Sequence, residues 1–96
     1  MVLGILKEIR AGEKRVALNP QIAKQFIEKG FQVKLEKSAG EASSYRDQDY
    51  ESVGVSLAAS KEELLQSCDL VLKINPPGLD EVKMAKPGIT WLSLLY

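Results

Sequence analysis

The sequence contains no histidine and a single cysteine, Cys68. Without histidine the chain lacks the commonest general base and the commonest metal ligand, and it cannot form a Ser-His or Cys-His nucleophile. We therefore expect no metal site, because zinc in particular depends on histidine and cysteine ligands. One cysteine cannot form an internal disulfide, which fits a reducing compartment. Cys68 is expected to be a small residue of the core.

Phosphate-binding motifs and the G-x-S-x-G motif of serine nucleophiles are absent as well. The seven glycines never stand two positions apart, so there is no G-x-G-x-x-G, and neither a Walker A sequence nor a G-x-S-x-G occurs. We therefore expect no cofactor-binding residue in this chain. The 13 basic and 13 acidic side chains balance, which gives no electrostatic reason to expect a nucleic acid partner. No apolar run reaches the ~20 residues that span a bilayer, so we expect no direct membrane insertion.

The chain does contain an alternation of strand and helix patterns. Its best core strand, 70–74, is almost continuously aliphatic, as in a parallel sheet that is covered on both faces. Asn19 and Pro20 mark a helix start, the first as N-cap and the second as the first helical residue. Strands are expected at 2–5, 31–36, 55–57, 70–74 and 89–95, and helices at 20–29, 48–53, after the capping-box sequence 60–63, and at 79–85.

This order predicts an α/β fold with a doubly wound, mostly parallel sheet of the flavodoxin-like kind. The small polar residues 38–44 are expected to form a loop, and Asp47 is expected to cap the helix that follows. The chain stops within or just after its last expected strand. We therefore interpret residues 1–96 as one incomplete domain, a fragment of a longer protein.

A charged loop, 7–19, joins the first strand to the first helix and is rich in basic side chains. It should lie at the carboxyl edge of the sheet together with the loops 38–44 and 75–78, because each follows an expected strand. Ligands of α/β proteins usually bind at this edge. The alternative is a solvated connection whose charges serve solubility.

Four stretches carry a resemblance to a known family. They are K-E-x-x-x-G-E-x-R-V-A-x-x-P at 7–20, G-F-Q-V at 30–33, K-I-N-P-P at 73–77 and K-P-G at 86–88. Together they resemble the N-terminal domain shared by alanine dehydrogenases and the alpha subunit of proton-translocating NAD(P) transhydrogenase. The resemblance implies an oxidoreductase subunit of two domains, whose Rossmann NAD domain follows in sequence. It also implies NAD and NADP as cofactors of the full enzyme, membrane subunits as partners, and a cytoplasmic place beside the inner membrane.

Two positions separate the branches of that family. In alanine dehydrogenases a lysine that holds the pyruvate carbonyl follows the core strand, and a histidine acting as acid and base ends the next strand. Here the matching positions are Asn75 and Tyr96. An amide supplies no positive charge, and a tyrosine with a pKa near ~10 is a poor base at neutral pH. Asn75 resembles the transhydrogenase form, in which hydride passes directly between two nicotinamides.

The resemblance makes Arg15, Lys73 and Asn75 the candidate catalytic residues. In alanine dehydrogenases the arginine that matches Arg15 clamps the substrate carboxylate with its planar fork. The alternative for Arg15 is a structural ion pair with Glu8 or Glu13. Lys73 is either a cation of the site or an ordinary strand-edge lysine.

The favoured hypothesis is therefore the N-terminal domain of a transhydrogenase alpha subunit, which forms part of the cleft for hydride transfer between NAD(H) and NADP(H), coupled to proton translocation. The alternatives are a fragment of an alanine dehydrogenase-like enzyme and a non-catalytic interaction module. The chain alone is expected to be inactive and to bind no cofactor. The last expected strand is apolar on both faces, so we expect a homo-oligomer that buries it, Trp91 being either core or interface. Its apolar residues are Ile89, Trp91, Leu92, Leu94 and Leu95.

Overall fold

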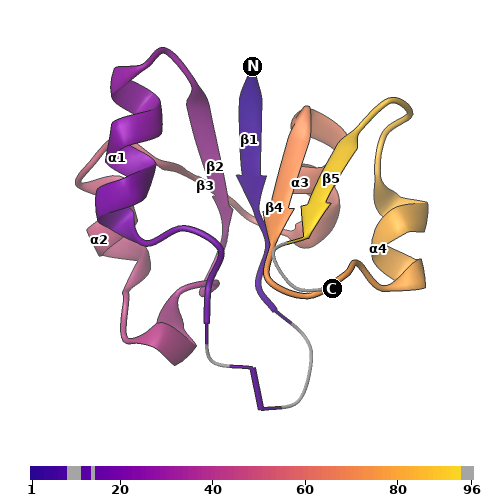
Figure 1. The fold of residues 1–96 in the computed structure, drawn as a ribbon, viewed down its shortest axis with the longest axis horizontal. Coiled ribbons are helices and arrows are strands. Elements are labelled where there is room, and N and C mark those ends of the chain that lie inside the picture. The colour runs from indigo at the N-terminus through magenta and orange to yellow at the C-terminus, as the bar shows by residue number, and fades with distance from the viewer. Residues whose placement is uncertain (9–11, 14, 94–96) are drawn as a thin grey trace.

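The computed structural model describes residues 1–8, 12–13 and 15–93 of the chain. Five parallel strands form one sheet in the order β3-β2-β1-β4-β5 (Figure 1). The predicted α/β fold with a parallel sheet is therefore confirmed. The flavodoxin-like part of that prediction is wrong, because a flavodoxin-like sheet has the order 2-1-3-4-5, whereas β1 lies here between β2 and β4. The strands are β1 (Val2–Ile5), β2 (Gln32–Glu36), β3 (Ser56–Ala58), β4 (Leu70–Lys73) and β5 (Thr90–Ser93). The helices are α1 (Pro20–Glu28), the short 3-10 helix η1 (Glu41–Ser43), α2 (Asp47–Glu51), α3 (Lys61–Ser67) and α4 (Leu79–Met84).

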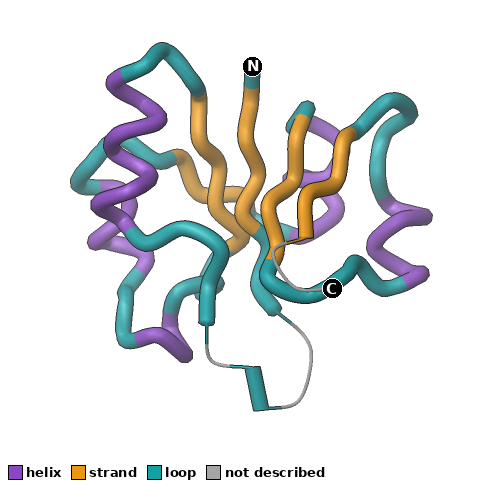
Figure 2. The backbone as a smooth tube through the Cα atoms, in the orientation of Figure 1, coloured by secondary structure: helices purple, strands orange, loops and turns teal. Residues whose placement is uncertain are grey.

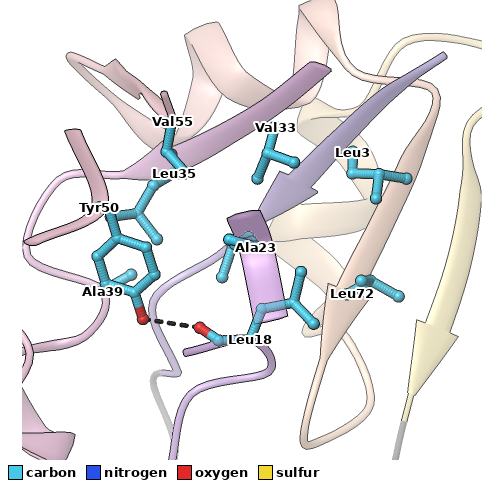
Figure 3. Close-up of a cluster of buried hydrophobic side chains, with 10 residues drawn as sticks. Leu3, Leu18, Ala23, Val33, Leu35, Ala39, Tyr50, Val55 and Leu72 are labelled. Carbon is cyan, nitrogen blue, oxygen red and sulfur yellow. Dashed lines mark hydrogen bonds between the residues drawn. The ribbon is translucent and has the colours of Figure 1, made fainter. Parts of the chain in front are cut away.

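The two faces of the sheet are covered by different helices. On one face α1 packs over β2 and α2 over β3, and Ala23 and Tyr50 are buried with Leu35 in a first apolar cluster (Figure 3). On the other face α3 buries Leu64 and Leu65 in a second cluster, which includes Cys68 and, from β4, Val71. This arrangement explains the near-continuous aliphatics of β4, because alternate side chains of a doubly covered strand enter opposite clusters. Cys68 is fully buried in the second cluster, which confirms it as a core residue, and burial raises the pKa of its thiol.

The first helix begins as the sequence predicts. Asn19 is extended and its Oδ1 accepts a hydrogen bond from the backbone N–H of Ile22 at 2.8 Å, while Pro20 is the first helical residue. The helix ends at Glu28, and Gly30 follows with a φ of +99°, a conformation in which glycine meets no steric penalty.

The prediction that Asp47 caps the second helix is wrong. Arg46 occupies the N-cap position, and its backbone N–H donates to Oδ2 of Asp49 at 2.8 Å. Asp47 is the first helical residue, and its Oδ1 accepts from the backbone N–H of Ser38 at 2.8 Å. Asp47 thereby holds the loop after β2 against α2. That loop is also more ordered than predicted, since η1 occupies part of it.

The remaining boundaries differ from the predicted ones by a few residues. The third strand is shifted by one position, and β5 begins one residue later than expected. Ser60 caps α3 as predicted, with Oγ accepting from Glu63 N–H at 3.1 Å. The reciprocal bond of the capping box goes elsewhere, because Glu63 accepts from the N–H of Ala59 at 3.3 Å. Leu94 and Leu95 lie outside the described residues.

Candidate functional site

The loops that follow β1, β2 and β4 meet at the carboxyl edge of the sheet, as the sequence predicts (Figure 2). The backbone N–H of Lys7, after β1, donates to Oε1 of Glu36 at the end of β2 at 2.8 Å. On the other side, Glu8 bonds to the chain after β4. Residues 9–11 and 14 of the first loop lie outside the described portion of the chain. The described residues at this edge form a network of carboxylates and cations.

Glu8 lies at the centre of that network. Its Oε2 accepts from the N–H of Ile74 at 3.0 Å, and its Oε1 accepts from the N–H of Asn75 at 3.1 Å and from Asn75 Nδ2 at 3.3 Å. The Glu8 side chain is only 3% exposed. A buried carboxylate that accepts several N–H bonds is well satisfied, so Glu8 is an anchor that fixes the backbone at the end of β4.

Glu13 connects the candidate residues Arg15 and Asn75. Arg15 donates to both Glu13 oxygens, from Nε at 2.9 Å and from Nη2 at 3.0 Å, and Asn75 Nδ2 donates to Glu13 Oε1 at 2.8 Å. The hydrogen bonds from Arg15, with that from Asn75, lower the pKa of Glu13 to about 2. The same pair raises the pKa of Arg15. The ion-pair alternative for Arg15 is thus present in the structure, with Glu13 as the partner.

Lys73 is a buried member of the network. Its side chain is 2% exposed and its Nζ lies 3.1 Å from Oε1 of Glu81 on α4, and 3.8 Å from Oε1 of Glu8. Lys61, at the start of α3, donates to the other oxygen of Glu81 at 2.8 Å. Lys73 is therefore not an ordinary strand-edge lysine in contact with solvent. It is a buried cation between two carboxylates.

Glu81 is the residue of this site that sequence reasoning missed. Its Oε1 also accepts from the backbone N–H of Gly78 at 2.8 Å, so one carboxylate caps α4 and binds two lysines. Burial opposes ionisation of Glu81, but the hydrogen bonds from Lys61, Gly78 and Lys73 outweigh it and lower the pKa. A signal was present, because a glutamate three residues after the helix cap is the capping-box position. Its contact with Lys73 could not be read from that spacing.

The structure brings all three candidate residues together through the two carboxylates. Asn75, 4% exposed, bonds both Glu8 and Glu13, so it cross-links the loop after β1 to the loop after β4. Arg15 extends from Glu13 with 61% of its side chain exposed. Tyr96 lies outside the described residues. Among the residues that are described, no group of three or more histidine, cysteine or acidic side chains could hold a metal ion. Over that same portion of the chain, no helix is both long and apolar enough to cross a membrane.

Comparisons with known proteins give two kinds of relative. The chain is 33% identical over 96 residues to an alanine dehydrogenase of Halomonas elongata, covering all of this chain and 26% of that protein. It is 36% identical over 93 residues to an NAD(P) transhydrogenase subunit alpha polypeptide of Rhodospirillum rubrum, covering 92% of this chain and 24% of the relative.

Solved structures give the same pair. A transhydrogenase from Sinorhizobium meliloti superimposes with a TM-score of 0.92 at 27% identity, covering 99% of this chain and 28% of that one. An L-alanine dehydrogenase superimposes with a TM-score of 0.84 at 31% identity, covering 90% of this chain and 24% of the other. The chain therefore spans about a quarter of the length of the relatives that it matches. The family described as "Alanine dehydrogenase/PNT, N-terminal domain" matches residues 4–96, and the chain belongs to this family.

Proposed function

We propose that this chain is the N-terminal portion of an NAD(P) transhydrogenase alpha subunit. In this role it forms one wall of the cleft in which hydride passes between NAD(H) and NADP(H). The full enzyme would bind both cofactors, couple the transfer to proton translocation through membrane subunits, and keep this domain on the cytoplasmic side of the membrane. The domain's own contribution is a rigid wall, with Arg15, Lys73 and Asn75 as its site residues.

One observation carries this proposal. The groups that would bind an α-keto acid are already paired within the chain, since Glu13 accepts both prongs of the Arg15 fork and Asn75 bonds Glu8 and Glu13. An amide at position 75 also lacks the positive charge that would stabilise an alkoxide developing from a substrate carbonyl. Hydride transfer between two nicotinamides needs neither a carboxylate clamp nor that cation.

The described residues of this edge lack the usual features of a site for the diphosphate of a dinucleotide. Phosphate sites of α/β proteins use backbone N–H groups of a glycine-rich turn at a helix N-terminus. Here no glycine-rich G-x-G-x-x-G sequence precedes α1, and Arg15, an exposed cation of this loop, is already paired with Glu13. We therefore place NAD(H) on the Rossmann domain of the full subunit. The isolated chain should bind NAD(H) weakly or not at all and show no dehydrogenase activity, and micromolar NAD(H) binding in calorimetry would contradict this.

The alternative is an alanine dehydrogenase-like enzyme, and a specific observation favours it. Arg15 is well exposed, so its guanidinium could exchange Glu13 for a substrate carboxylate. The relatives of that type are also about equally similar in sequence. A non-catalytic interaction module is the third candidate, and it predicts neither activity in the intact protein.

The test uses the intact protein that carries this chain, assayed in membranes with its partner subunits. We expect reduction of an NAD⁺ analogue of shifted absorbance by NADPH, and no reduction of NAD⁺ by alanine. Arg15→Gln sharpens the distinction. A carboxylate clamp contributes about 2–3 kcal/mol, so in an alanine dehydrogenase the KM for alanine would rise roughly 30- to 150-fold. In a transhydrogenase, Arg15→Gln should change the rate of hydride transfer between the two nucleotides by less than about tenfold. Alanine-dependent NADH formation would overturn the proposal.

The matched control is Arg46→Gln. Arg46 is another exposed arginine that pairs with a carboxylate, Asp49 at 3.5 Å, but it lies at the start of α2, outside the network of Glu8 and Glu13. Its replacement removes the same charge and should leave both reactions unchanged.

A further inference from the structure

We propose that Glu81 is a positioning residue for the candidate site: by holding Lys73 at the edge of the sheet, it leaves Glu8 to fix Asn75. This inference rests on the proposed function in one respect only, namely that the loop carrying Asn75 belongs to the wall of the hydride-transfer cleft. It concerns four residues from four places in the chain: the loop after β1 carries Glu8, the end of β4 carries Lys73, the turn beyond it carries Asn75 and α4 carries Glu81.

The first step is the division of Lys73 between two carboxylates. The Nζ atom lies within hydrogen-bond distance of both Glu81 oxygens, at 3.1 and 3.4 Å, but 3.8 Å from Oε1 of Glu8. The 3.8 Å distance between Lys73 Nζ and Glu8 exceeds the usual range of an N–H···O bond. Lys73 is thus bonded to α4 and is only an electrostatic neighbour of Glu8.

The second step concerns Oε1 of Glu8, to which Lys73 is not hydrogen-bonded. Oε1 of Glu8 accepts from the backbone N–H and from Nδ2 of Asn75, at 3.1 and 3.3 Å. Because Nδ2 also donates to Glu13 at 2.8 Å, both donor hydrogens of the amide have carboxylate acceptors. The orientation of the Asn75 side chain is therefore set from two sides.

The third step is the consequence of losing the charge on Glu81. A buried ammonium group must keep an anionic partner, because desolvation without one is costly. Glu8 is the other carboxylate found within 4 Å of Lys73 Nζ in the described residues. We expect Lys73 to move onto Glu8 Oε1 and to compete with Asn75 for it. Lys61 would tolerate the same change, because its side chain is 18% exposed and lies 4.0 Å from Glu36.

The experiment is a double-mutant cycle in the intact protein, using Glu81→Gln and Lys73→Met. Glutamine keeps the shape of Glu81 while removing its charge, and methionine removes the competing ammonium at similar length. We expect Glu81→Gln to lower kcat for transhydrogenation by about tenfold with little change in the KM for either nucleotide, as for a misplaced group beside the reacting centre. Lys73 is itself a candidate site residue, so the double variant tests the competition for Glu8 through the Asn75 side chain and not through kcat.

A second readout does not depend on activity. The side-chain amide resonances of Asn75, assigned from their loss in Asn75→Asp, should shift in Glu81→Gln and return toward the wild-type position in the double variant. If the intact protein proves to be an alanine dehydrogenase, the proposed function fails but these resonances still test the positioning. The double variant buries no unpaired ammonium, so it should fold even if Glu81→Gln alone does not.

Asp80→Asn is the matched control. Asp80 is exposed in the same first turn of α4, so its replacement makes the same change to the charge near the helix N-terminus. It should leave kcat and the Asn75 resonances unchanged. The proposal would be overturned if kcat were unchanged in Glu81→Gln, or if the Asn75 resonances stayed in place in Glu81→Gln or were displaced in the double variant.

Discussion

Tyr50 connects two segments that are far apart in the sequence. Its ring is fully buried and its hydroxyl donates to the backbone carbonyl of Leu18 at 2.7 Å, just before α1 begins (Figure 3). The bond holds the end of the charged loop against α2. It therefore acts on the same loop that carries Glu8 and Glu13, from the opposite end.

Replacing Tyr50 with phenylalanine should destabilise the fold. The change leaves the Leu18 carbonyl without this buried donor, and such losses cost about 1–2 kcal/mol of unfolding free energy. Urea denaturation measures the effect. Tyr45→Phe is the control, since Tyr45 is half-buried and its ring contact with Tyr50 does not involve the hydroxyl. A Tyr50→Phe variant as stable as Tyr45→Phe would show that the bond contributes nothing.

The same residue predicts a dependence of stability on alkaline pH. Burial, together with the nearby Tyr45 and the carboxylates Asp47 and Asp49, raises the pKa of Tyr50 to about 12. In the unfolded chain the phenol ionises near ~10. The contribution of the Tyr50 hydroxyl to the free energy of unfolding is thus complete below a pH of about 10, and it is lost as the pH rises through about 12. Wild-type stability should fall relative to Tyr50→Phe across this window, and parallel curves would contradict the assignment.

At the scale of elements, the close approach of β1 and α3 depends on Gly4. A Cβ added there would lie 2.9 Å from Sγ of Cys68 and 3.1 Å from Cδ2 of Leu64. Real Cβ atoms essentially never come that close to another heavy atom, so the Cys68 side chain or α3 itself would have to shift. The absence of a side chain at this one position lets the helix pack directly on the strand that leads to the site.

Gly4→Ala should therefore destabilise the protein by about 1–3 kcal/mol, as other overpacked cores do. Cys68→Ala removes the nearest atom and should cost about 1 kcal/mol by itself as a small cavity. The double variant should then lose less than the sum of the two, because the added methyl fills the space of the sulfur. Thermal unfolding of the four proteins gives the coupling, and strictly additive losses would argue against this contact.

Local signals in the sequence predicted most of the elements, but they left the network at the site hidden. Asn19 and Ser60 cap the helices that follow them, because a cap depends on residues only three positions away. Asp47 also has a side chain that commonly caps helices, yet it accepts a hydrogen bond from Ser38, nine positions earlier. The bond between Glu8 and Asn75 spans 67 positions. Contacts of that kind follow from the order of strands in the sheet, which no local pattern encodes.

At the scale of the whole molecule, the sheet order explains why the candidate site forms at all. The central strand β1 has β2 on one side and β4 on the other, and all of them run parallel. The first loop therefore leaves the sheet between the ends of its two neighbours. That position lets Lys7 bond to the end of β2 while Glu8 bonds to the end of β4. The residues that resemble the family motif at 7–20 thus hold two loops together, whichever reaction the intact protein performs.

Association of the chain is a prediction at the same scale. β5 is an edge strand, paired with β4 on one side, and an unpaired edge can accept another strand. Trp91 is half-buried against the apolar cluster that contains Leu64 and Leu65 of α3, while Leu92 points to the other face and is 49% exposed. Apolar surface left in water costs about 25 cal/mol per Å², which favours burial against a second copy.

We expect the 96-residue chain to form a dimer or larger oligomer through β5. Sedimentation should show that Leu92→Lys weakens it, whereas Ile22→Lys, on exposed α1 away from β5 (Figure 1), should not. A monomeric wild-type chain at high concentration would contradict this, because the exposed edge would then be stable in water without a partner.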